Sequence, residues 1–217
     1  RNIVKNKRWA IAPTLGFGLG GDTQFYLGYI HLEQNNIPDG GVLTIGLPGY
    51  TTPSPGTRDF LTTAARVDPS NFYGTQDDHD KVKSDTLSAI FERSFGENLH
   101  LTNVARWSQT TQEYQLSSFM AGPTQLLTPN ITDPSTWTAT INVNNKNATN
   151  TTVTNQTNLQ AHFRTGFIRH SVSTGVEFIR EDVKALTYAA TAAATTGLYV
   201  PVKIYAPSLY NTGYKRI

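Results

Sequence analysis

The chain has 217 residues with 18 basic and 16 acidic side chains, a net charge of +2, and this balance gives no reason to expect a nucleic acid partner. It contains no cysteine, which excludes disulfides and thiolate metal sites. Charged residues make up only 16% of the chain, below the quarter typical of soluble domains, and no apolar run reaches the about 18 residues that a transmembrane helix requires.

The first predicted element is a hairpin over about residues 9–29. Apolar side chains occupy every second position over 9–19 and again over 25–29, and this period of two predicts strands. Gly and Asp residues at 20–22 supply the turn. The glycines at 16–21 also spell GxGxxG, but a dinucleotide site needs a helix after this motif, whereas another strand follows here.

A long loop is predicted from residue 35 to residue 83, where no period is sustained and Pro, Gly, Thr and Asp are frequent. Connections beyond about 15 residues are uncommon in compact domains and are usually functional. Strands are predicted at 84–95 and 99–114, joined by a short turn, although a helical stripe also fits 84–95. A second long loop is predicted over 115–150, ending in a tract rich in Asn and Thr.

The most regular stretch, residues 158–181, predicts a hairpin of two long strands with a tight corner near residues 168–170. One face is apolar or small throughout, whereas the other carries polar and charged side chains. His170 is interpreted as a turn residue and His162 as part of the polar lining. After this hairpin comes a third loop with an Ala/Thr tract at 185–197, whose state stays open because Ala favours helix and Thr favours strand.

These elements amount to about six antiparallel strands in three hairpins, an all-β fold. In a soluble β-sandwich module that binds carbohydrate or protein, the apolar faces would pack on a second sheet. In a transmembrane barrel they would face lipid and the polar faces would line the lumen; long loops at one end and tight turns at the other favour this arrangement. Six strands cannot close such a barrel, and the chain opens on Arg1 without an initiator Met, so we expect an internal segment of a longer protein.

Several motifs resemble those of the TonB-dependent outer-membrane receptors. The pattern TG-x-x-x-H-x-V-x-x-G-x-E at 165–177 resembles a recurring hairpin of that family. A more specific likeness, to its catecholate siderophore receptors, lies in IPDGG at 37–41, IGLPGY at 45–50, NFYGT at 71–75 and TNQTNL at 154–159. The resemblance implies a barrel of about 22 strands with an N-terminal plug. Residues 1–217 would then be part of the barrel domain, with the plug and the remaining strands absent.

The same resemblance implies a function in transport rather than catalysis. Members of the family import ferric siderophores across the outer membrane of Gram-negative bacteria by TonB-dependent active transport. The partners implied are a ferric catecholate siderophore, TonB through the absent plug region, and outer-membrane lipid including lipopolysaccharide. No nucleic acid partner and no cofactor are expected, and the protein is expected to be a monomer.

A ferric catecholate is aromatic and anionic, so its receptor should offer aromatic faces and Arg or Lys side chains. Residues of both kinds gather in the first long loop, and two more lie toward the end of the 99–114 strand. Lys81 and Lys83, at the end of the loop, meet the same description. The candidate ligand-binding residues are Tyr50, Arg58, Phe60, Arg66, Phe72, Tyr73, Arg106 and Tyr114.

The run Asp77, Asp78, His79, Asp80 contains residue types that bind metals. Adjacent residues of an extended chain point in opposite directions, and the spacing matches no EF-hand loop. We therefore interpret the run as a solvated acidic loop without a metal. No G-x-S-x-G, H-E-x-x-H or Walker motif occurs, so the sequence predicts no enzyme.

Overall fold

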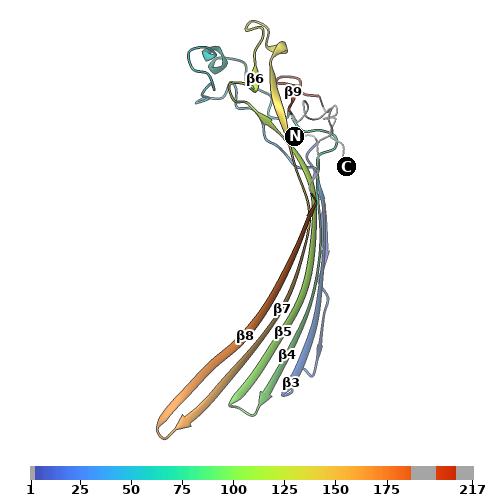
Figure 1. Cartoon of the computed structure of the whole chain (residues 1–217), viewed down its shortest axis with the longest axis vertical. Coiled ribbons are helices and arrows are strands. Elements are labelled where there is room, and N and C mark those ends of the chain that lie inside the picture. The colour runs from blue at the N-terminus through green and yellow to red at the C-terminus, as the bar shows by residue number, and fades with distance from the viewer. Residues whose placement is uncertain (1–2, 187–198, 209–217) are drawn as a thin grey trace.

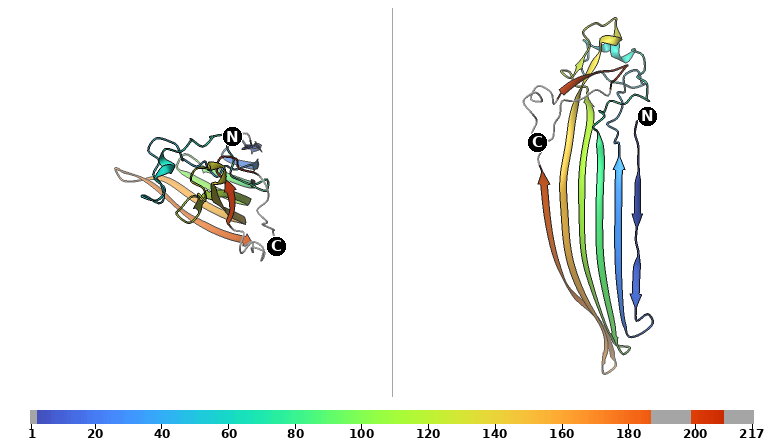
Figure 2. Two further views of the ribbon diagram at one scale, coloured as in Figure 1. Left: turned by 90° about the horizontal axis from the view of Figure 1, so that it is seen from above. Right: turned by 90° about the vertical axis from the view of Figure 1, so that its right-hand side faces the viewer.

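The computed structural model describes residues 3–186 and 199–208. Its strands form one antiparallel sheet that stands as a single tall, curved layer (Figure 1). Figure 2 shows the loops gathered at one end of this layer and tight turns at the other. Within the described ranges, no helix is both long enough and apolar enough to cross a membrane.

The sheet is a wall of long strands, each paired with its neighbour along the chain. In spatial order the wall consists of β1 (Arg8–Ile11) with β2 (Thr14–Phe17), β3 (Thr23–Asn36), β4 (His79–Phe95), β5 (Leu99–Met120), β7 (Thr138–Thr165) and β8 (Ile168–Leu186). The first two share one register on β3, so they act as one strand interrupted at Ala12 and Pro13. Counted this way, six long strands form three hairpins, which confirms the predicted fold class.

Four short elements lie at the loop end of the wall. Two of them, β6 (Leu126–Leu127) and β9 (Tyr199–Lys203), pair with the first residues of β7. The other two are single turns of 3-10 helix, η1 (Asp59–Thr62) and η2 (Pro134–Thr136). The first long loop therefore runs over 37–78, slightly shorter than predicted at both ends.

The predicted second loop over 115–150 is wrong in most of its length. β5 continues to Met120 and β7 begins at Thr138, so the tract rich in Asn and Thr is strand and the loop is confined to residues 121–137. Ala139, Ile141 and Val143 alternate with polar residues at the start of β7, but the alternation is lost over residues 144–152, where both faces carry polar side chains. The backbone of the two strands nevertheless pairs in an unbroken register from Leu99 opposite Ala161 to Met120 opposite Thr140.

The corner of the last hairpin lies two residues earlier than predicted. β7 ends at Thr165 and β8 begins at Ile168, and Gly166 adopts a φ of 61°, which glycine tolerates best. His170 is therefore a strand residue, and its ring stacks on Phe163 with centroids 4.8 Å apart. Of the Ala/Thr tract, 185–186 end β8 and 187–197 lie outside the described residues.

The apolar face of the wall is open. The side chains of Phe17, Phe163 and Val176 remain 55%, 52% and 52% exposed, and in the described part of the chain no second sheet covers them. Residues directly opposite each other in neighbouring strands share a face, so the registers place these apolar residues on one side, here called the outer face. A β-sandwich would seal this face beneath a second layer, so that alternative is not supported.

Polar side chains on the outer face form hydrogen bonds with one another across neighbouring strands. Asn103 interrupts the apolar pattern of β5, and its Nδ2 donates to Asn155 Oδ1 at 3.1 Å and to Thr157 Oγ1 at 2.7 Å. Asn155 Nδ2 donates back to Asn103 Oδ1 at 3.2 Å. All three residues lie on the same face by register. Lateral pairing of this kind leaves these amides with partners inside an apolar surface.

The loop end has a core of its own, unlike the wall. The loops 37–78 and 121–137, with β9 and the residues after it, fold against the upper ends of β5 and β7; we call this unit the loop layer. By register it covers the continuation of the outer face, through β7 residues such as Ile141 and Val143. The buried core consists of Leu43, Ile45, Leu61, Val67, Tyr73, Leu126, Trp137, Ala139, Ile141, Val143, Val202 and Ile204.

Candidate ligand-binding surface

Two of the predicted ligand residues, Arg106 and Tyr114, lie on the face of β5 opposite the apolar band, here called the inner face. Arg106 is exposed there, between Ser88 of β4 and Thr154 of β7. Eight residues separate Arg106 from Tyr114, which corresponds to about 26 Å along a strand. Tyr114 therefore lies near the loop end and Arg106 lies deeper in the wall.

Lys146 lies beside Tyr114 and was not among the residues predicted from the sequence. It is exposed and lies directly opposite Tyr114 across the β5 and β7 pair, so an aromatic ring and a cation share one place on the inner face. On the other side Tyr114 pairs with Asp80, whose carboxylate accepts from Gln34 Nε2 at 2.7 Å. Lys146 was not identified from the sequence because it falls in the Asn/Thr tract that was predicted as loop.

Two loop candidates, Phe72 and Tyr73, lie inside the loop layer. Phe72 is 5% exposed and Tyr73 is 2% exposed. The Tyr73 hydroxyl donates to the Ile204 carbonyl oxygen at 2.6 Å, and burial raises the pKa of this hydroxyl. The Tyr73 ring also meets Phe119 of β5 edge-on, with centroids 5.8 Å apart. In this structure both side chains are packing elements with no surface to offer a ligand.

Two further loop candidates pack against the same core, and a third, Arg58, is hydrogen-bonded beside it. Phe60 meets Trp137 edge-on with centroids 5.3 Å apart, and Tyr50 is half-buried against the core. Burial raises the pKa of the Tyr50 hydroxyl, partly opposed by the nearby Arg58. Arg58 itself donates from Nη1 to the Leu126 carbonyl oxygen at 2.5 Å, which ties η1 to β6.

Arg66 is the predicted loop cation that stays exposed. Its backbone lies so close to Gly46 that a Cβ at that glycine would approach the Arg66 Cα at 2.5 Å. The structure thus holds the Arg66 backbone while leaving its side chain outside. The eight predicted residues are not brought together: the loop aromatics lie on the outer-face side of β5, whereas Arg106 and Tyr114 lie on its inner face.

The glycine-rich motifs of the first loop explain how that loop approaches the wall. A Cβ at Gly40, in IPDGG, would lie 2.1 Å from the Ser117 carbonyl oxygen of β5. No larger residue fits there without moving the backbone. Gly46, in IGLPGY, has a φ of 77° in addition to its contact with Arg66. Gly40 lets the loop lie directly on β5, and Gly46 lets two stretches of the loop lie against each other.

A buried carboxylate joins the end of the first loop to β5. Asp78 is 3% exposed, so interpreting it as part of a solvated loop is wrong. Its carboxylate accepts from the Ser117 amide at 3.0 Å, from Ser117 Oγ at 2.6 Å and from Thr75 Oγ1 at 2.9 Å. Three donors compensate the cost of burying the charge. Among the described residues, no group of three or more His, Asp or Glu side chains is arranged to hold a metal ion.

The geometry defines a class of protein before any relative is considered. One curved antiparallel sheet with an open apolar outer face, a polar inner face, tight turns at one end and folded loops at the other matches the wall of an outer-membrane β-barrel. No protein-family model matches the chain.

Comparison with solved structures agrees with that class. The crystal structure of the ferric-catecholate import receptor Fiu from Escherichia coli K12, in its open form, covers 100% of this chain and 32% of its own, with a TM-score of 0.87 and 41% identity. The siderophore receptor PiuA from Acinetobacter baumannii covers 96% of this chain and 30% of its own, with a TM-score of 0.67. At 20% identity, the likeness to PiuA is one of fold.

Comparison with curated sequences names the family. The catecholate siderophore receptor Fiu of Escherichia coli strain K12 is 45% identical over 181 residues, which are 83% of this chain and 24% of that receptor. The probable TonB-dependent siderophore receptor PiuA of Acinetobacter baumannii is 26% identical over 181 residues, 83% of this chain and 22% of that protein. The chain belongs to the TonB-dependent siderophore receptors, which are outer-membrane proteins of Gram-negative bacteria. It spans about a quarter of the length of these relatives.

Proposed function

We propose that the protein containing this chain imports ferric catecholate siderophores across the outer membrane by TonB-dependent active transport. In this proposal residues 1–217 are part of the barrel domain and supply wall and outer loops. The observation that carries it is the 41% identity to the ferric-catecholate import receptor Fiu over a superposition that covers 100% of the chain. The role is transport, with the ferric complex as cargo and no catalytic step.

The inner face of the wall supplies the ligand contacts in this proposal. Tyr114 and Lys146 lie opposite each other in the register near the loop end, and an aromatic ring and an ammonium suit the aromatic and anionic parts of a catecholate complex. Arg106, deeper on the same face, would be a later contact on the way inward. Arg66 is the candidate in the first loop that a ligand can reach from outside.

The remaining five predicted residues act indirectly. Tyr50, Arg58, Phe60, Phe72 and Tyr73 pack, or hydrogen-bond, within the loop layer. They would hold the loop layer in a fixed arrangement on the upper ends of β5 and β7. Their loss would therefore affect ligand binding through the position of the loops.

Two partners besides the ferric siderophore complete the proposal. TonB would act through the plug region that precedes the barrel in the family, and outer-membrane lipid, including lipopolysaccharide, would surround the apolar band. A monomer is proposed because a sheet that closes into a barrel leaves no free strand edge for another subunit.

Uptake of radioactive iron, supplied as a ferric catecholate to cells lacking the gene for the full-length protein, tests this function. Returning the gene should restore uptake in cells with TonB and not in cells without it. Uptake that is the same with and without the gene would contradict the proposal.

Substitutions on the inner face test the ligand contacts. Arg106→Ala should weaken ligand binding by about 10- to 100-fold, because a hydrogen bond to a charged group contributes about 1.5–3 kcal/mol. Tyr114→Ala should weaken binding by about 3- to 10-fold through the lost aromatic contact. The matched control is Ser108→Ala, on the same face of β5 between them. Equal affinity of all three variants would remove Arg106 and Tyr114 from the ligand path.

A further inference from the structure

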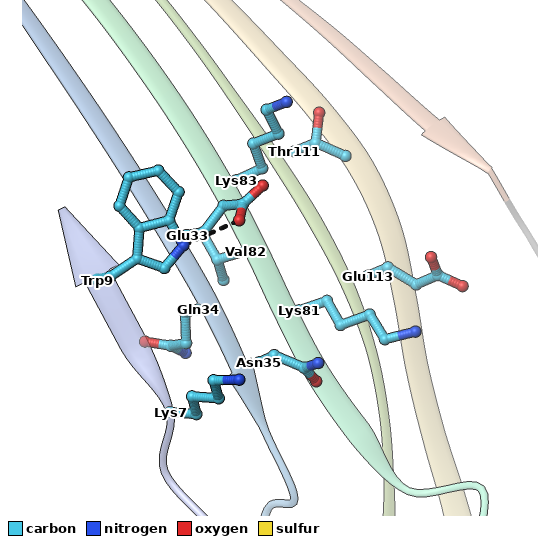
Figure 3. A pocket seen from close by; sticks show the side chains of 10 residues that line it. All are labelled: Lys7, Trp9, Glu33, Gln34, Asn35, Lys81, Val82, Lys83, Thr111 and Glu113. Atoms are coloured by element: carbon cyan, nitrogen blue, oxygen red, sulfur yellow. Dashed lines mark hydrogen bonds between the residues drawn. The ribbon is translucent and has the colours of Figure 1, made fainter. Parts of the chain in front are cut away.

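Cations occupy both faces of the wall. On the outer face, Lys7, Lys81 and Lys83 lie around a groove near the loop end, between β1 and β5 (Figure 3). Lys81 and Lys83 were candidates for siderophore contacts from the sequence, but the register places them on the outer face, away from the lumen. Cations that meet a ligand inside the barrel must therefore lie on the inner face.

The inner face carries exposed cations at three levels. Lys146 lies near the loop end and Arg106 lies deeper in the wall. At the turn end, Arg164 of β7 lies directly opposite Arg169 of β8. Arg164 is ten residues from Thr154, the β7 partner of Arg106, so both share the inner face at a separation of about 33 Å along the strand. The three levels therefore run from the loop end of the wall to its turn end.

The arginine pair at the turn end has no charge to balance it. Like charges directly opposite each other in a sheet are destabilising. Within the described ranges, neither guanidinium group has a carboxylate within 4.0 Å. The two arginines line an open hollow whose other lining residues include no Asp or Glu: Asn98, His162, Phe163, His170 and Ser171. The hollow therefore suits an anion that comes from outside this part of the chain.

The carboxylates nearest to the pair along the chain and in the neighbouring turn leave it unpaired. Glu97 lies in the turn between β4 and β5, which is held beside β7 by the His162 amide donating to the Asn98 carbonyl oxygen at 2.8 Å. Its side chain is exposed. On β8, Glu177 is eight residues from Arg169, which corresponds to about 26 Å along the strand.

We propose that Arg164 and Arg169 form a contact for the anionic ferric complex at the exit of the barrel, which the complex meets after Arg106. A guanidinium group keeps its charge at physiological pH and stacks on aromatic rings, so it suits both parts of a catecholate complex. An anion between the two groups also offsets their mutual repulsion. This inference rests on the proposed function, and it adds a contact at the far end of the path that begins at Tyr114 and Lys146.

The test measures uptake of radioactive iron, supplied as a ferric tris-catecholate, by cells that carry the full-length protein. The double variant Arg164→Gln with Arg169→Gln should lower the maximal rate of uptake about 3- to 10-fold, at the lower end of what electrostatic focusing of a charged ligand contributes. The purified variant should bind the complex as tightly as the parent protein, because the entrance contacts are intact. Arg164→Lys with Arg169→Lys retains both charges and should keep most of the rate. The control, Arg93→Gln, removes a cation from the outer face at the same end of the wall.

Three results would overturn the inference. An unchanged rate in the glutamine variant would show that the pair does not contact the complex. An equal loss of rate in the glutamine and lysine variants would show that charge is not the cause. A lower unfolding temperature of the purified glutamine variant would mean that the pair holds another segment of the protein in place, since removing two like charges should not destabilise the hairpin by itself. Absent uptake by the parent protein would instead contradict the proposed function, whereas normal uptake by the parent with slow uptake by the glutamine variant supports both.

Discussion

The wall and the loop layer differ in where they place their large apolar side chains, although they share strands. In the wall, large apolar side chains such as Phe178, 68% exposed, lie on an open surface, and the sheet has no second layer. In the loop layer, Leu61 and Leu126 are 0% exposed and pack in a closed core. The outer face of β5 and β7 takes part in both regions. The difference indicates that lipid covers the apolar side chains of the lower part of this face, whereas protein covers those of the upper part.

The largest expected effect comes from emptying the core of the loop layer. Tyr73→Ala removes a buried ring and should destabilise the loop layer by about 3–5 kcal/mol, while the wall keeps its unfolding temperature. Limited proteolysis of the purified full-length protein should show faster cleavage between residues 40 and 75. Phe167→Ala is the control, since this ring is 96% exposed at the last tight turn. Cleavage as slow as in the parent protein would show that the loop layer does not depend on its core.

A charge on the open face should affect the wall and spare the loop layer. Val176→Arg puts a cation on the outer face and should cost about 2–4 kcal/mol if the residue lies near the middle of the bilayer. The unfolding temperature of the purified barrel should fall, and Ser173→Arg, on the inner face of the same strand, should lower it much less. If both variants unfold at the same temperature, the two faces do not differ in their surroundings as the structure requires.

The link between the two regions should break with the buried carboxylate. Asp78→Ala leaves the amide and hydroxyl of Ser117 without their acceptor and should cost about 2–3 kcal/mol. Faster amide hydrogen exchange is expected at residues 75–78 and at Ser117, with little change in the lower wall. Asp77→Ala, at the exposed neighbour, is the matched control. Unchanged exchange at Ser117 would mean that the loop is held by packing alone.

The smallest effect should come from one hydroxyl. Tyr73→Phe keeps the ring and removes the donor to the Ile204 carbonyl oxygen, which still accepts from Asn71 Nδ2 at 3.3 Å. A loss of about 1 kcal/mol is expected, seen as a modest rise in proteolysis of the loop layer. A loss as large as that of Tyr73→Ala would mean that the hydrogen bond, and not the ring, carries the stability.

The wall could be predicted from sequence because its two faces differ. In the first hairpin and in the hairpin around Phe163, apolar and polar residues alternate, and this period identifies both the strand and the face. Residues 144–152 of β7 gave no such signal, since Asn and Thr occupy both faces of the strand around Lys146. Pairing in the sheet, which is a long-range interaction, makes this tract a strand.

The residue types of the candidate site could be predicted from the sequence, but which residues of those types lie at the site could not. An aromatic residue in a polar loop suits a ligand contact and a loop core equally well, and composition does not tell Tyr73 from Tyr114. The structure separates them by burial and by the face of β5 that each one serves. Lys81 and Lys83 were likewise assigned to the first long loop, because their strand was predicted to start only at residue 84, whereas both lie in β4 on its outer face.

Asp78 is hydrogen-bonded to Ser117, which lies on the same strand as Tyr114. Ser117 is three residues from Tyr114 and faces the opposite side of the sheet. A side chain mounted on a strand that is fixed from behind is preorganised, so a ligand that meets it loses little conformational entropy in ordering it. Affinity at the barrel entrance would then depend partly on a carboxylate that no ligand ever touches.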